Sequence, residues 1–195
     1  MTGPAPASDG AVLRTATSLV IAAASTYQSL AALPAGGGVP ALGVVRDHIA
    51  DALVALRQAR ADLSEATRAV GARVAQDLDP GQAAVVAQVL PTVRGPGDVV
   101  GLALIVEDVL AQTLVADAVV LSVPTVRALV AGLGAAAAAR TARLLLVASL
   151  LATGRPELLA TPPDLFSLPA AIGTLGSPDA RYPTDKAVAA GDGAP

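Results

Sequence analysis

The chain has no cysteine and very few aromatic residues. Without cysteine it can form no disulfide, carry out no thiol chemistry and offer no thiolate to a metal ion. Aromatic residues make up only 2% of the 195 positions although 53% are hydrophobic, so the core must consist mainly of Ala, Val and Leu. Small aliphatic side chains let helices approach closely, whereas sandwiches and barrels normally use more aromatic and β-branched residues. The composition therefore favours an all-α protein.

Charge is also sparse. Charged residues make up 15% of the chain, the net charge is −3, and no basic patch is interleaved with aromatic residues, which excludes the usual signature of nucleic-acid binding. The most apolar stretches are 11–33, 99–123 and 126–153, and charges interrupt the last two. Because a spanning helix needs about 18 consecutive apolar residues, these stretches are predicted to be core helices, and no transmembrane segment is expected.

Helical periodicity and helix-breaking residues divide the chain into four long predicted helices. Residues 1–8 are rich in Pro and small residues and are expected to be disordered, and Ser8 or Asp9 can cap the first helix. Asp98 and Ser122 are the predicted N-caps of the third and fourth helices, and Gly154 is the predicted stop of the fourth. The four helices are predicted at 9–33, 40–70, 98–121 and 124–153.

The remaining segments complete a predicted four-helix bundle spanning residues 9–154. A long crossover around residues 70–97 contains a short predicted helix at 82–90. Residues 155–195 are rich in Pro and Gly and are predicted to be an extended tail that packs partly on the bundle.

Several short motifs, in order along the chain, resemble the ferritin-like domain proteins of actinobacteria. The motifs are Leu13–Leu19 with Thr26–Gln28, Asp47–Asp51, Val106–Asp108, the region around Arg140, and Tyr182–Gly191. The resemblance implies a ferritin-like fold. Relatives of this kind often carry an export signal, which suggests the cell envelope; the N-terminus here lacks a basic segment leading into an apolar run, which favours the cytoplasm, unless a signal has been removed.

The resemblance also implies where a di-iron site would lie, and most of its ligand positions are occupied by residues that cannot bind iron. Such proteins use a Glu on two helices and a Glu-x-x-His pair on each of the other two. The corresponding positions here are Val20, then His48 with Asp51, then Glu107, and finally Ala138 with Thr141. Only His48, Asp51 and Glu107 could ligate, so a di-iron oxidase is not expected.

These three remaining residues have two interpretations. Two carboxylates and an imidazole could hold a single Fe, Mn or Zn ion. Alternatively, Glu107 forms a buried polar pair with His48 or Arg46, which satisfies both groups in an apolar core. The second interpretation is favoured, so no cofactor is expected. Arg140 and Arg143 could reach a phosphate or carboxylate ligand, but they are expected instead to extend to the surface or to pair with nearby acids. The available acids are Asp117, Asp98 and Glu107.

The sequence therefore leaves three functional hypotheses. The first is a non-catalytic bundle with a structural or protein-interaction role, as a homo-oligomer or a subunit of an assembly, because the third and fourth helices carry more aliphatic surface than one core can bury. The second is a carrier of an apolar small molecule in a slot lined by Val20, Tyr27, Ala138 and Thr141. The third is a mononuclear metal-binding protein that uses His48, Asp51 and Glu107.

Overall fold

The chain is an all-α protein. The computed structural model describes residues 8–33, 41–77 and 87–154, and within these ranges every regular element is a helix. The division of the chain by internal contacts gives two units, Met1–Ala160 and Thr161–Pro195, and all described residues lie in the first. The elements are α1 (Asp9–Ala31), α2 (Ala41–Ala69), the 3-10 turn η1 (Leu90–Thr92), α4 (Pro96–Val120) and α5 (Pro124–Ala152).

The four long helices lie within three residues of their predicted ends. Ser8 caps α1, since its hydroxyl accepts a hydrogen bond from the amide of Ala11 at 3.3 Å. Gly154 follows the end of α5 with a φ of +67°, the left-handed conformation that stops helices. The expectations for residues 1–7 and for the tail at 155–195 lie outside the described residues, as does most of the short helix predicted at 82–90.

Two of the predicted caps were wrong. Helix α4 begins at Pro96 after the N-cap Gly95, and Asp98 lies inside its first turn, where its Oδ2 accepts hydrogen bonds from the amides of Arg94 and Gly95. Ser122 does not cap α5. Its hydroxyl and amide both donate to the carboxylate of Asp9, which also accepts from the amide of Val123. Asp9 thus ties the start of α1 to the corner between α4 and α5, and these hydrogen bonds lower its pKa.

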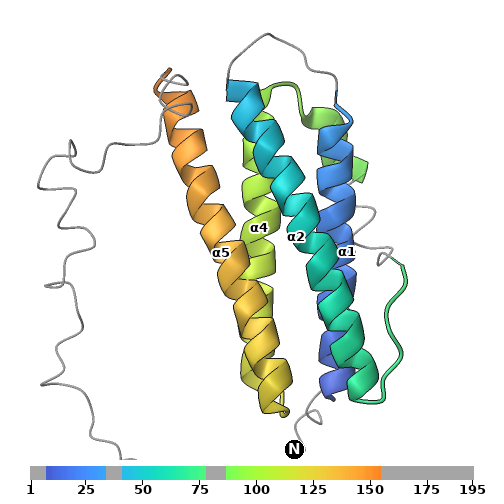
Figure 1. Cartoon of the computed structure of the whole chain (residues 1–195). Coiled ribbons are helices and arrows are strands. Elements are labelled where there is room, and N and C mark those ends of the chain that lie inside the picture. The colour runs from blue at the N-terminus through green and yellow to red at the C-terminus, as the bar shows by residue number, and fades with distance from the viewer. Residues whose placement is uncertain (1–7, 34–40, 78–86, 155–195) are drawn as a thin grey trace, which may run out of the picture. The chain divides into compact units, whose positions relative to one another are not determined.

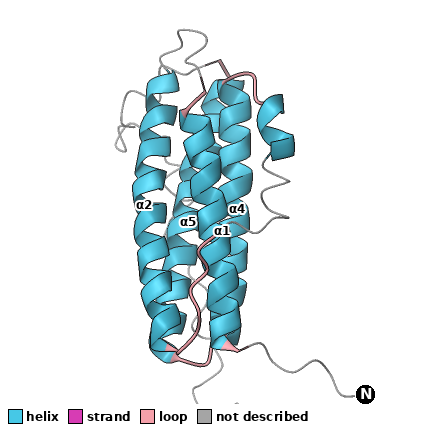
Figure 2. Cartoon of the chain, turned by 90° about the vertical axis from the view of Figure 1, so that its right-hand side faces the viewer, coloured by secondary structure: helices cyan, strands magenta, loops and turns pink. Residues whose placement is uncertain are grey.

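The helices pack in two antiparallel pairs joined by a long crossover. Helix α1 packs against α2, and α4 packs against α5, while α1 also contacts α4 (Figure 1). In Figure 1, α1 and α5 run upward and α2 and α4 run downward, so the chain must return along the helices between α2 and α4. Figure 2 shows the described start of this connection, residues 71–77, as a loop along the helices, and the guanidinium of Arg60 donates to the carbonyl of Gln76 in it at 3.2 Å.

A continuous aliphatic core runs between the helices. Its largest fully buried members are leucines on all four helices together with Tyr27, and alanines fill the spaces between them. Such a core depends on close helix approach, because small side chains leave cavities when helices move apart. The largest fully buried aliphatic side chains are Leu13, Leu56, Leu63, Leu110, Leu121, Leu144, Val20, Val100 and Val130.

Gly134 sets the approach of α5 to α4. A Cβ atom added there would lie 3.1 Å from Cγ2 of Val115 and 3.3 Å from both its backbone nitrogen and the Cβ of Leu114. Gly134→Leu is therefore expected to lower the free energy of unfolding by about 1–3 kcal/mol, the usual cost of overpacking. Gly43→Leu is the control, because a Cβ at Gly43 meets nothing within 4 Å. There the better helix propensity of leucine should raise the free energy of unfolding by about 0.5 kcal/mol. Urea unfolding measures both, and equal effects would contradict the packing described for Gly134.

Helices α4 and α5 are unusually apolar on their outer faces as well. By length and composition alone both could cross a membrane, a test that core helices also pass. Only 33% of the apolar window of α4 and 17% of that of α5 is buried in the structure. These two helices therefore present more apolar surface than the core of this chain covers.

Candidate functional site

A buried polar network joins all four helices near the middle of the structure. It contains Tyr27 of α1, His48 of α2, Glu107 of α4 and Arg140 of α5. Each residue lies on the inward side of its helix, since Tyr27, His48 and Glu107 are buried and Arg140 is half-buried. The network is the candidate functional site because buried polar groups in an aliphatic core are costly and are kept only when they are paired.

Glu107 is the centre of the network. Its side chain is 0% exposed, and its Oε1 accepts two hydrogen bonds of 2.8 Å, one from the hydroxyl of Tyr27 and one from Nε of Arg140. Its Oε2 is buried and has no hydrogen-bond partner among the described residues. Charge-assisted hydrogen bonds of this length are the strong ones, so the carboxylate links α1, α4 and α5 directly.

His48 joins the network through Tyr27. Its Nε2 lies 3.5 Å from the tyrosine hydroxyl, whose only hydrogen is donated to Glu107. The tyrosine oxygen can therefore act only as an acceptor toward His48, which assigns the imidazole hydrogen to Nε2. Burial, with a contribution from the carboxylate of Glu107, raises the pKa of Tyr27 well above its usual range, so the phenol stays protonated.

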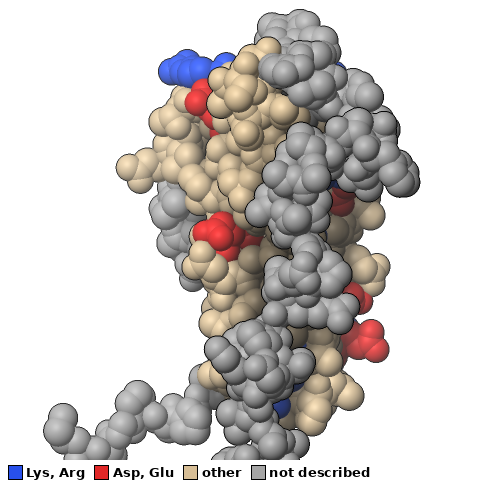
Figure 3. All heavy atoms as spheres, turned by 90° about the vertical axis from the view of Figure 1, so that its left-hand side faces the viewer, with Lys and Arg blue, Asp and Glu red and all other residues tan. Residues whose placement is uncertain are grey.

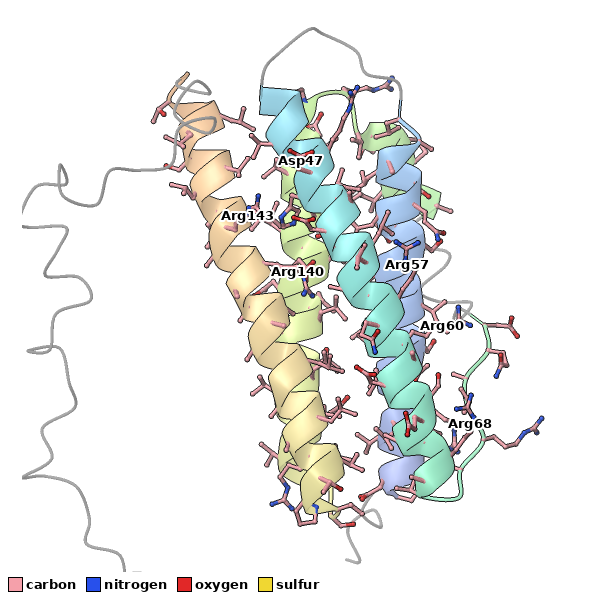
Figure 4. All side chains as sticks on the ribbon, in the orientation of Figure 1. Asp47, Arg57, Arg60, Arg68, Arg140 and Arg143 are labelled. Carbon is pink, nitrogen blue, oxygen red and sulfur yellow. The ribbon has the colours of Figure 1, made fainter. Side chains whose placement is uncertain are left out.

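Arg140 and Arg143, two of the three arginines of α5, have different environments. Arg140 and Arg143 both extend from the side of α5 that faces α2 (Figure 4). Arg140 is 20% exposed and reaches the buried carboxylate, whereas Arg143 is half-exposed and lies 3.7 Å from Asp51, whose side chain is 72% exposed. The second pair is a surface contact at the limit of ion-pair distance and contributes little to stability.

The structure separates the three ligands of the hypothetical single-metal site. His48 and Glu107 face the interior, but Asp51 points outward to Arg143. Among the described residues, no group of three or more His, Cys, Asp or Glu side chains is arranged to hold a metal ion. Of the two residues favoured as partners of Glu107, Arg46 is exposed and His48 connects to it only through Tyr27. Glu107 was also one of the three acids available to Arg140, and it does pair with Arg140; its hydrogen bond with Tyr27 was not predicted.

Of the four residues predicted to line an apolar slot, three face the interior and one does not. Val20 and Tyr27 are buried and Thr141 is half-buried, but Ala138 lies on the exposed side of α5. Ala137 takes the inward position instead, and its carbonyl accepts a hydrogen bond from the Thr141 hydroxyl at 3.2 Å. The error is a shift of one residue within the alanine run, where no residue type marks the helix register.

The buried imidazole of His48 makes stability depend on pH. Burial lowers its pKa, as do the positive charges of Arg143 and Arg140, while the carboxylates of Glu107 and Asp51 act in the opposite direction. Because the unfolded chain takes up the proton more readily, stability is highest above the ordinary pKa of about 6.5 and falls as pH drops below it. Urea unfolding from pH 7.5 to 5.0 should show this fall in the natural chain and a smaller one in His48→Gln. Parallel pH profiles would contradict this role of His48.

Fold and network together define an all-α protein whose helices are joined by a buried Tyr–Glu–Arg network. Comparison with family models, with curated proteins and with solved structures gives no match. Its function must therefore be inferred from the residues of this chain alone. In the network the carboxylate of Glu107 accepts hydrogen bonds from the protonated phenol of Tyr27 and the guanidinium of Arg140. These bonds join α1, α4 and α5.

Proposed function

We propose that this chain is a non-catalytic, ferritin-like four-helix bundle that associates with a second copy of itself through the outer faces of α4 and α5. The observation that carries the proposal is the distribution of exposed large apolar side chains. Among the described residues seven of the eight lie on these two helices, and only Val54 lies elsewhere. The seven are Ile105, Val109, Val115, Val119, Val120, Leu145 and Leu146.

The outer face of α5 also carries a regular row of five small residues followed by a leucine, here called the α5 seam. The seam residues are all exposed and follow one another at alternating steps of four and three. This spacing is the heptad pattern by which helices pack side by side, and small residues permit a short distance between helix axes. The seam consists of Ala128, Gly132, Ala135, Ala139, Ala142 and Leu146.

The size of the face suits a dimer. Helices α4 and α5 contain 25 and 29 residues, which corresponds to a length of roughly 40 Å each. Two adjacent helices spaced by about 10 Å then present roughly 800 Å², which is the area that one partner buries in a standard interface. A two-fold dimer uses the same patch on both copies, so one apolar face is sufficient.

A lipid bilayer fits the same face less well. Asp108 is exposed at the midpoint of α4 and accepts a hydrogen bond from Gln112 at 2.7 Å. Figure 3, viewed from the α5 side, shows mostly uncharged described atoms with an acidic group near mid-height. A carboxylate at the bilayer midplane costs about 3 kcal/mol or more, whereas a protein interface accommodates a hydrogen-bonded Asp–Gln pair.

The network supports the non-catalytic part of the proposal. In ferritin-like proteins the carboxylates of the bundle centre ligate metal, but here Glu107 is engaged by Tyr27 and Arg140. The inward positions of α5 around it are Ala137 and Leu144, which have no ligating atoms. A guanidinium in contact with the carboxylate also opposes a second cation at the same place.

Sedimentation velocity of the purified chain across a range of concentrations tests the proposal. We expect a reversible equilibrium between monomer and dimer with a dissociation constant in the micromolar range or below. A monomer at all concentrations up to about 100 µM would contradict self-association. Flotation of the chain with neutral phosphatidylcholine vesicles in the same experiment series would assign the face to a membrane instead.

A further inference from the structure

A cavity lies at the end of the helices where α1 finishes and α2 and α4 begin. Its volume is about 420 Å³, within the range of small-molecule sites. The last turn of α1, one face of the first turns of α2, and the residues that lead into α4 form its walls. It is separate from the buried network and from the α5 seam. Its walls include Leu30, Ile49, Leu53, Val99, Arg46 and Arg94.

The walls of this cavity are mainly apolar. Leu30 and Ile49 are buried and Leu53 and Val99 are half-buried, so aliphatic carbon faces the cavity from three helices. An aliphatic ligand chain would remove both its own surface and these walls from water, which stabilises by about 25 cal/mol per Å² of apolar area buried.

Two arginines give the cavity a charge. Arg46 of α2 and Arg94, which precedes α4, both line it, and both are exposed. Neither guanidinium has an ion-pair partner within 4 Å among the described residues. The two ion pairs in this part of the chain are formed by Arg140 and Arg143. The nearest acid in sequence to Arg94 is Asp98, and its Oδ2 accepts from the backbone amides of Arg94 and Gly95 rather than from the guanidinium. Unpaired guanidinium groups at an apolar cavity are complementary to an anion with an apolar body.

We propose that this cavity is a binding site for an amphipathic anion, namely an aliphatic chain that ends in a carboxylate. The chain packs on Leu30, Ile49, Leu53 and Val99, and the carboxylate accepts hydrogen bonds from Arg46 and Arg94. This site is a different one from the apolar slot predicted within the core, and it goes beyond the proposed self-association.

Calorimetric titration with decanoate, below its micelle concentration, tests the proposal. We expect one site per chain in the natural protein and binding at least tenfold weaker in the double variant Arg46→Gln/Arg94→Gln. The control Arg68→Gln, in the last turn of α2, should bind within twofold of the natural chain. The uncharged analogue 1-decanol should bind at least tenfold more weakly than decanoate.

A second variant tests the cavity itself. Ala50 lines it and is exposed on α2, so Ala50→Phe fills space without disturbing the core, which thermal unfolding verifies. This variant should lose decanoate binding by at least tenfold. No saturable binding to the natural chain up to about 1 mM, or equal affinity in the natural chain, the double-arginine variant and Ala50→Phe, would overturn the proposal. Equal affinity would place the ligand on another apolar surface, such as the α5 seam.

Discussion

Arg140→Met is expected to lower the free energy of unfolding by about 3 kcal/mol, because it leaves the carboxylate of Glu107 buried without its cationic partner. Glu107 is 0% exposed and its Oε2 has no partner among the described residues, so Arg140 is the one positive charge that compensates the buried carboxylate there. Methionine keeps most of the aliphatic length of arginine, which separates the loss of charge from a loss of packing. Urea unfolding at pH 7.5 measures the difference.

Arg143→Met is the matched control, since Arg143 lies three residues along the same helix. Its contact with Asp51 is exposed on both sides, so the change should be below about 0.5 kcal/mol. The triple variant Tyr27→Phe/Glu107→Leu/Arg140→Met replaces the network by apolar groups and should recover to within about 1 kcal/mol of the natural chain. A loss in Arg140→Met no larger than in Arg143→Met would show that the buried ion pair does not stabilise the fold.

The second large effect is expected at the proposed interface. Ile105 is 61% exposed on the outer face of α4, so Ile105→Lys costs the monomer little. In a dimer the same change places a lysine within the interface of each copy, and we expect the dissociation constant to rise about 100-fold, or about 2.7 kcal/mol. Sedimentation velocity measures the constant, and thermal unfolding at low concentration verifies that the monomer is intact.

Val54→Lys is the control for this prediction. Val54 is 60% exposed, almost the same as Ile105, but it lies on α2. The dimer dissociation constant of Val54→Lys should stay within about twofold of that of the natural chain. If both lysine variants weaken the dimer equally, the effect is one of general charge, and the face formed by α4 and α5 has no special role.

The fold could be predicted largely from sequence because helix ends carry local signals. The proline at the start of α5 and Gly154 after its end both act through backbone conformation, which depends on neighbouring residues. The prediction of Asp98 as an N-cap was wrong for a local reason, and the prediction of Ser122 was wrong because of a tertiary contact. Pro96 starts α4 earlier than Asp98 suggests, and Ser122 is taken by Asp9, 113 residues away in the chain.

The site could be predicted only in part. His48 and Glu107 were candidates because the resemblance to ferritin-like proteins places them at ligand positions, and Tyr27 because it was predicted to line the apolar slot. The hydrogen bond between Tyr27 and Glu107 could not be derived, and Glu107 could not be singled out from the three acids available to Arg140, since both depend on how the helices align along their axes. Arg140 lies three residues after the inward Ala137 and four before the inward Leu144, which is the helical spacing of one face. This spacing could not be recognised in the sequence, because every residue of the alanine run is equally apolar. The cavity beside Arg46 and Arg94 has no sequence signal, since its walls come from three distant segments.

The central claim, self-association through the α5 seam, is tested most directly by disulfide cross-linking, because the natural chain contains no cysteine. Single cysteines would replace Ala128, Ala135, Ala139 and Ala142 in turn, with exposed Ala61→Cys on α2 as the control. A disulfide needs Cα atoms about 4.4–6.8 Å apart, so only positions close to the two-fold axis can react. We expect rapid covalent dimer formation for at least one seam variant under mild oxidation and none for the control. Reaction of every seam variant no faster than Ala61→Cys would contradict self-association through this face.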